Sequence, residues 1–148
     1  MSRVFVAAAL VGTTLIGLQF TGPVHTNPAT DASLDVERVE TVPADVARTL
    51  RLACRDCHSN ETKWRWYTYV APLSWWTIGH VNAGRDELNF SRWGSYGERM
   101  RETRLHAVCG LTRKGKMPLP AYARAHSEAR ITEAEIDALC AWTSRPRR

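Results

Sequence analysis

The sequence predicts a small all-α domain that follows an N-terminal apolar helix. Three observations predict this class. Apolar residues recur at helical spacing in several segments, and one segment carries a complete helix N-terminal capping signal. The aromatic stretch at residues 64–76 contains Pro72, so we interpret it as a loop with short helical turns and not as a strand. A length of 148 residues favours one domain.

The first twenty residues are predicted to be a signal anchor or a signal peptide. Arg3 precedes an uncharged apolar run from Val4 to Phe20, a layout that both kinds of segment share. The run is near the short limit for spanning a bilayer as a helix. Because no small-x-small cleavage site follows it, we favour a retained anchor. Either interpretation places the rest of the chain on the periplasmic side of a bacterial inner membrane or free in the periplasm.

Residues 21–43 are interpreted as a linker and residues 44–148 as the folded domain. Pro23, Pro28 and Pro43 interrupt any helix in the linker. The formal net charge is +5, but the charges along the domain are mixed in sign, which is typical of a solvated surface. No nucleic-acid-binding motif accompanies them, so we expect no nucleic-acid partner.

Four helices are expected in the domain. Val46, Leu50 and Ala53 share one face of the first, Ile78 and Val81 point inward from the second, and Leu105, Val108 and Leu111 recur at helical spacing in the third. Thr132 and Glu135 form an S/T-x-x-E capping box at the start of the last. The expected helices cover residues 44–53, 75–87, 97–113 and a final segment that ends near Trp142.

The strongest motif is Cys54-Arg55-Asp56-Cys57-His58, which has the C-x-x-C-H pattern of c-type haem attachment. Both thiols can add to the vinyl groups of one porphyrin edge, and the adjacent imidazole is then held against the iron. We therefore expect one covalent haem c, with His58 as an axial ligand. A zinc site and a dithiol redox pair are the alternatives. Cys109 and Cys140 lack the spacing of a second zinc knuckle, and no βαβ pattern surrounds the motif.

Met117 is the preferred second axial ligand. It lies in Gly115-Lys116-Met117-Pro118-Leu119-Pro120, where two prolines stiffen the loop that presents the thioether. His80 is the main competitor, because it follows an aromatic run that we expect near the haem. Met100, His106 and His126 are weaker candidates, and His25 is set aside as part of the linker.

Two further interpretations concern tryptophans and the remaining cysteines. We expect at least one of Trp64, Trp66 and Trp75 to contact the haem through its flat ring. Cys109 and Cys140 form either a disulfide, which an oxidising compartment favours, or two buried free thiols.

The chain resembles the bacterial haem-binding domain family of small single-C-x-x-C-H proteins. The likeness covers about residues 44–143 and rests on residues 54–64, Trp66-Tyr67, residues 71–75, Gly84-Arg85, residues 89–91 with Trp93, residues 115–120 with Tyr122, and a last helix ending near Trp142. Arg65 departs from the family, which typically has proline there. The resemblance implies a cytochrome-c-like helical layout, haem binding and redox activity. In that layout the first and last helices cross, so we expect Val46 and Leu50 to meet Leu139 and Trp142.

These observations favour a non-enzymatic protein that transfers single electrons to an unidentified redox partner. A six-coordinate haem has no open site for a substrate, and methionine ligation raises its reduction potential. Two other functions stay open. A displaceable distal methionine would allow a peroxidase or a gas or redox sensor, and a haem that only stabilises the fold would leave an interaction module.

Overall fold

The computed structural model describes residues 2–146, and over this range the chain forms helices and no strand. The predicted all-α class with an N-terminal apolar helix is confirmed. The outermost ends of the two expected segments 1–20 and 44–148, namely residues 1, 147 and 148, lie outside the described residues.

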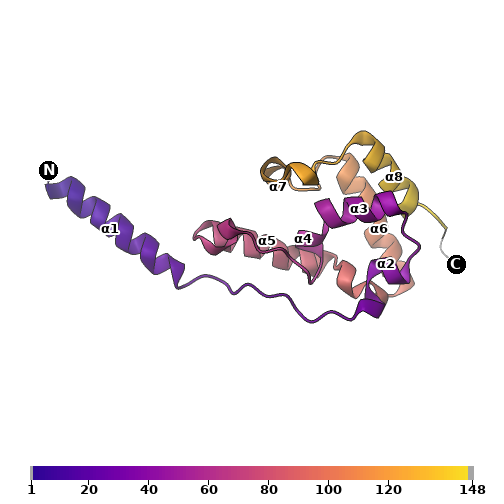
Figure 1. Cartoon of the computed structure of the whole chain (residues 1–148), viewed down its shortest axis with the longest axis horizontal. Coiled ribbons are helices and arrows are strands. Elements are labelled where there is room, and N and C mark those ends of the chain that lie inside the picture. The colour runs from indigo at the N-terminus through magenta and orange to yellow at the C-terminus, as the bar shows by residue number, and fades with distance from the viewer. Residues whose placement is uncertain (1, 147–148) are drawn as a thin grey trace.

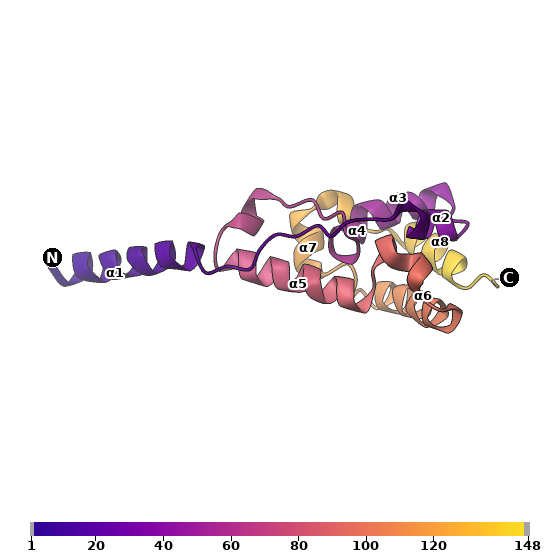
Figure 2. The ribbon, with the colours of Figure 1, turned by 90° about the horizontal axis from the view of Figure 1, so that it is seen from below.

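Helix α1 (Ser2–Gln19) projects away from the other elements, as Figures 1 and 2 show, and none of its residues is buried. An extended segment follows and runs along the domain (Figure 1). The remaining elements are η1 (Ala32–Leu34), α2 (Val36–Val39), α3 (Ala44–Ala53), α4 (Arg55–His58), η2 (Trp66–Tyr69), α5 (Leu73–Glu87), η3 (Phe90–Ser95), α6 (Glu98–Arg113), α7 (Pro120–Ala125), η4 (Ser127–Ala129) and α8 (Glu133–Thr143).

The expectation that residues 21–43 form a linker is wrong for residues 32–40. This stretch folds into η1 and α2, and Val36 is fully buried in the main core. An ion pair joins Asp35 to Arg55 of the C-x-x-C-H motif, and Trp93 Nε1 donates to Glu40 Oε1 over 2.9 Å. A single helical turn is too short to show periodicity in the sequence, and prolines on either side gave the whole segment a linker composition.

Helices α3 and α8 pack together around the main hydrophobic core, as the resemblance implied. Val46 and Leu50 of α3 share this core with Leu139 and Trp142 of α8. All four side chains are buried. The capping box at the start of α8 is also present, because Thr132 Oγ1 accepts from Glu135 N and Glu135 Oε2 accepts from Thr132 N. Helices α5 and α6 cover nearly the ranges expected for them.

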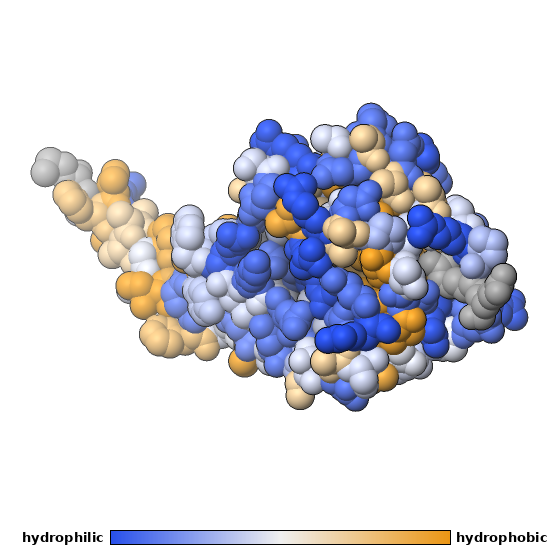
Figure 3. Space-filling view, turned by 45° about the vertical axis from the view of Figure 1, so that its right-hand side comes forward, coloured by the Kyte–Doolittle hydropathy of each residue, from blue (hydrophilic) through white to orange (hydrophobic). Residues whose placement is uncertain are grey.

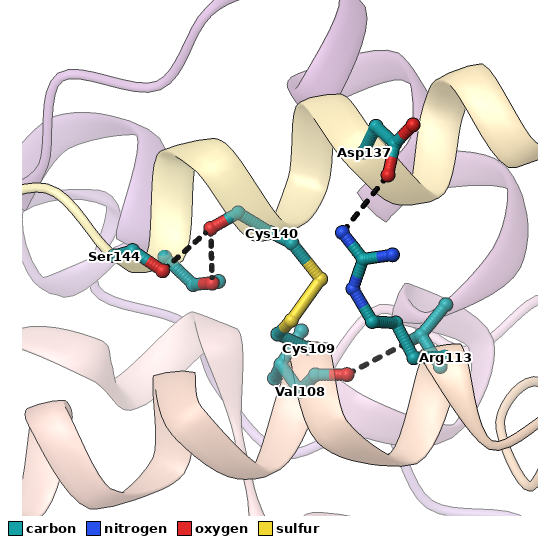
Figure 4. Close-up of a disulfide and its surroundings, with 8 residues drawn as sticks. Val108, Cys109, Arg113, Asp137, Cys140 and Ser144 are labelled. Carbon is teal, nitrogen blue, oxygen red and sulfur yellow. Dashed lines mark hydrogen bonds and ion pairs between the residues drawn. A yellow bond between two sulfur atoms is a disulfide. The ribbon is translucent and has the colours of Figure 1, made fainter.

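A disulfide between Cys109 and Cys140 joins α6 to α8 (Figure 4). An Arg113–Asp137 ion pair of 2.9 Å lies beside it and links the same two helices. Of the two interpretations that the sequence left open, the structure has the disulfide.

We expect the double variant C109S/C140S to be markedly less stable than the parent. The two bonded cysteines are separated by 31 positions in the sequence. For a loop of that length the loop-entropy relation gives about 3–4 kcal/mol of unfolding free energy. Urea unfolding of both proteins would measure the difference. Equal midpoints and equal slopes would show that the bond adds no stability.

Candidate functional site

A largely apolar cavity of about 590 Å³ lies between the C-x-x-C-H turn and helices α5, α6 and α7. Its volume falls within the range of small-molecule and cofactor sites. Cys54, Cys57 and His58 line one part of it, and Met100, Met117 and His80 also line it. The fold therefore brings together residues that are far apart in the sequence.

The C-x-x-C-H residues reach the cavity because a helical turn follows directly on α3. Cys54 N donates to Leu50 O, and His58 N donates to Cys54 O over 2.9 Å. Burial raises the pKa of Cys54 to about 12 and that of Cys57 to about 11. A dithiol redox pair needs the opposite, namely an electropositive environment that lowers a thiol pKa. This turn therefore lacks the electrostatics of a dithiol redox centre.

His58 is held in the form that a metal ligand requires. Its Nδ1–H donates to Gly84 O over 2.8 Å and to Leu88 O over 3.1 Å, which leaves Nε2 as the unprotonated nitrogen. Burial, as the main cause, lowers the pKa of His58 and favours the neutral imidazole. Metal-ligating histidines commonly donate their other ring nitrogen to a backbone carbonyl in this way.

Gly84 lets α5 approach the motif closely. A Cβ at this position would lie 2.7 Å from Cys57 O, which is a backbone atom. Real Cβ atoms are almost never found so close, and a backbone oxygen cannot swing aside as the end of a side chain could. The absence of a side chain at Gly84 is thus what permits the Gly84 O bond to His58.

A second set of contacts anchors the variable residues of the motif. Tyr122 lines the cavity, and its hydroxyl donates to Asp56 Oδ2 over 2.8 Å. The Tyr122 ring stacks on His126 at 4.1 Å between centroids. His126 is buried and accepts from the Tyr67 hydroxyl. Helix α7 is thereby tied to the C-x-x-C-H turn on one side of the cavity.

The structure places both leading candidates for the second ligand at the cavity. Met117 and His80 line it, as does Met100, whereas His106 and His126 are absent from its lining. His80 Nδ1–H donates to Trp76 O over 2.8 Å. The geometry keeps both Met117 and His80 as candidates.

Trp64, Trp66 and Trp75 are absent from the lining of the cavity. Trp64 packs edge-on against His25 and lies under the guanidinium of Arg85. Trp66 is 78% exposed, and Trp75 lies against Gly22. Contacts with residues 22–25, which the sequence pattern did not predict, hold two of these rings away from the cavity.

Arg104 is a cavity residue that the sequence pattern did not predict. Its Nε and Nη1 atoms are buried without a hydrogen-bond partner, and its guanidinium lies over the Tyr96 ring at 4.5 Å. Buried donors that lack a partner are costly unless an acceptor reaches them. The signal was helical spacing, because Met100, Arg104, Val108 and Leu111 all line the cavity from one face of α6.

The site fits a haem better than it fits zinc. The cavity is mostly apolar, one part of it offers two thiols and an imidazole, and the two unpaired nitrogens of Arg104 suit a carboxylate. A zinc site would need further ligands. Cys109 and Cys140 are joined to each other, and residues 2–146 contain no group of three or more histidine, cysteine or acidic side chains placed to hold a metal.

Comparison with known proteins agrees with this geometry. A family model described as a haem-binding domain matches residues 13–145, whereas no curated protein and no solved structure matched the chain. The match covers the cavity, the motif and the last turns of α1. This chain belongs to the haem-binding domain family.

Proposed function

We propose that the protein carries one haem c, bonded through Cys54 and Cys57 and ligated by His58, and transfers single electrons. The observation that carries this proposal is the His58 imidazole, which is neutral, fixed by two carbonyls and placed beside both thiols at one cavity. A bound haem supplies reversible one-electron chemistry at its iron.

The chain's own residues set the conditions for that chemistry. The carbonyls of Gly84 and Leu88 orient the His58 ring and raise its basicity as a ligand. The apolar lining excludes water and lowers the local dielectric constant, which disfavours the more highly charged oxidised state. Met117 is our choice for the second ligand, because a thioether is the softer donor and raises the potential.

Arg104 is proposed to pair with a haem propionate. We expect the variant R104L to have a lower midpoint potential than the parent, since a buried cation near the iron favours its reduced state. Loss of the pair also raises the propionate pKa, so the midpoint should fall as pH rises through that pKa. Potentiometric titration at several pH values would show both effects, and R104K should retain most of the parental behaviour. If R104L had the parental midpoint potential at every pH, Arg104 would not pair with a propionate.

We further propose that α1 is retained as a membrane anchor and that the domain lies on the periplasmic side. Helix α1 is long and apolar enough to cross a bilayer, although a signal sequence would pass the same test. The match to the family begins inside α1 at residue 13, which supports retention. The formal net charge of the chain is +5, and this positive charge would steer an acidic redox protein toward it.

A peroxidase or gas-sensing function is the alternative, and His80 is the observation that favours it. If Met117 leaves the iron, His80 lies at the same cavity with its Nδ1 bonded to Trp76 O, and its Nε2 could act as a base toward a bound ligand. Optical spectra separate the two functions. Electron transfer predicts a six-coordinate low-spin haem that binds CO slowly, whereas a five-coordinate high-spin haem with fast CO binding would support the alternative.

A further inference from the structure

The C-terminal end of α1 and the residues that follow it contact the part of the domain that contains η2 and the start of α5. The Gln19 side chain accepts from Ala71 N over 3.1 Å and donates to Ala71 O over 3.5 Å. Six residues later, His25 stacks on Tyr69 at 4.0 Å and donates to Thr68 O over 2.8 Å. Figures 1 and 2 show α1 leaving the domain at this end, beside η2 and the start of α5.

The length of α1 fixes the depth of this junction once the helix spans a bilayer, which is the anchor proposed above. Eighteen residues with mean hydropathy 1.4 form the helix. At 1.5 Å per residue they extend about 27 Å, slightly less than the roughly 30 Å hydrocarbon core. A helix this short leaves no spacer, so Gln19 and the Ala71 backbone bonded to it would lie at the level of the lipid headgroups.

Exposed apolar side chains occur on both sides of Ala71 in the sequence. We name the following six residues the aromatic patch: Trp66, Tyr69, Val70, Leu73, Trp75 and Trp76. Single exposed apolar residues are ordinary, but so many within residues 66–76 mark an interaction surface. Tryptophan and tyrosine are the residues enriched at membrane–water interfaces, because one end of each ring is apolar and the other forms hydrogen bonds. The composition of the patch therefore suits a headgroup layer.

The charges near the aromatic patch also suit lipid. No aspartate or glutamate occurs before Asp31 or between Glu61 and Asp86, and Lys63 lies just ahead of the patch. Arg65 also lies there, but it forms an ion pair of 3.2 Å with Glu128. Carboxylates here would be repelled by anionic headgroups, and lysine and arginine are attracted to them. Figure 3 shows hydrophobic side chains along α1 that end where the helix joins the domain, and the domain face in that view is mostly hydrophilic.

We propose that the aromatic patch docks on the bilayer surface and orients the domain. This inference depends on the proposed anchor and adds a second, separate contact with the membrane. The Trp76 ring connects the docked face with the cavity, because it packs on His80 at 4.2 Å between ring centroids and His80 lines the cavity. Docking therefore holds the His80 side of the cavity next to the membrane.

Photo-cross-linking of the full-length, haem-loaded protein in lipid nanodiscs tests this. The probe is a phosphatidylcholine that carries a diazirine at the headgroup level, and mass spectrometry locates the adducts. We expect adducts within residues 66–76 as well as near the end of α1, and none within α8, at the opposite end of the domain. Adducts confined to residues 1–25 would overturn the docking.

A variant with the exposed side chains replaced sharpens the result. W66S/V70S/L73S should lose the adducts within residues 66–76 and keep the haem spectrum, because all three side chains are exposed and none lines the cavity. The control E98S/E102S changes exposed residues of α6 and should keep the adducts. A full-length chain that stays in the bilayer without patch adducts overturns the docking alone. Recovery of a soluble chain that lacks residues 1–20 overturns the anchor and the docking together.

Discussion

The variant G84A is expected to give much less haem-loaded protein than the parent. The protein that does carry haem should be less stable. The new methyl group would lie 2.7 Å from Cys57 O, so α5 must move away from the C-x-x-C-H turn. That movement breaks the bond from His58 Nδ1 to Gly84 O. Overpacking of this kind costs about 1–3 kcal/mol of unfolding free energy. Haem absorbance per mole of protein would measure the loss of haem, and urea unfolding would measure the loss of stability.

Gly79 provides the matched control, because it lies in the same helix and a Cβ there would meet nothing within 4 Å. Alanine favours a helix over glycine by up to about 1 kcal/mol, so G79A should be as stable as the parent or more so, with full haem content. If G84A behaves like G79A, the close approach of α5 to the motif does not matter for haem binding.

Replacing Met117 by alanine is expected to change the spectrum and the potential of the bound haem more than replacing Met100 or His80 does. Loss of the thioether should give a high-spin or a histidine-ligated spectrum. The midpoint potential should fall by on the order of 100 mV or more, since axial ligands tune haem potentials over roughly 0.8 V. Ferric spectra in the near infrared, where a methionine–iron band is weak but diagnostic, together with potentiometry would measure the change.

Met100 and His80 are the controls for this prediction, because both line the same cavity. The variants M100A and H80A should keep the methionine–iron band and a potential close to the parental value. A band that survives in M117A and disappears in M100A would assign the thioether to Met100. Loss of the low-spin spectrum in H80A alone would assign the second ligand to His80.

Local signals predicted several residues that line the cavity and the start of one helix. Cys54, Cys57 and His58 lie within five residues, so their proximity follows from one turn of chain. Met117 stands in a short proline-bounded loop, and Thr132 with Glu135 forms a capping box that depends on four residues. In each case the chemistry and the geometry are set by neighbours in the sequence.

Features that depend on tertiary contacts were harder to predict. Whether Cys109 and Cys140 pair depends on how α6 lies against α8, and no local pattern decides that. Arg104 stands among charged neighbours that suggested a solvated surface, and only its register with Met100 and Val108 places it at the cavity. Two of the three tryptophans expected at the haem, Trp64 and Trp75, pack instead toward the segment after α1.

The mass of the purified full-length protein tests the central claim most directly. Expressed in a host with haem-maturation machinery, the protein should gain the mass of one haem, keep it under denaturing conditions, and lose it in the double variant C54A/C57A. These results would establish two thioether bonds to a single porphyrin. A colourless protein with the mass of the polypeptide alone, made beside a known c-type cytochrome that matures normally, would contradict the account.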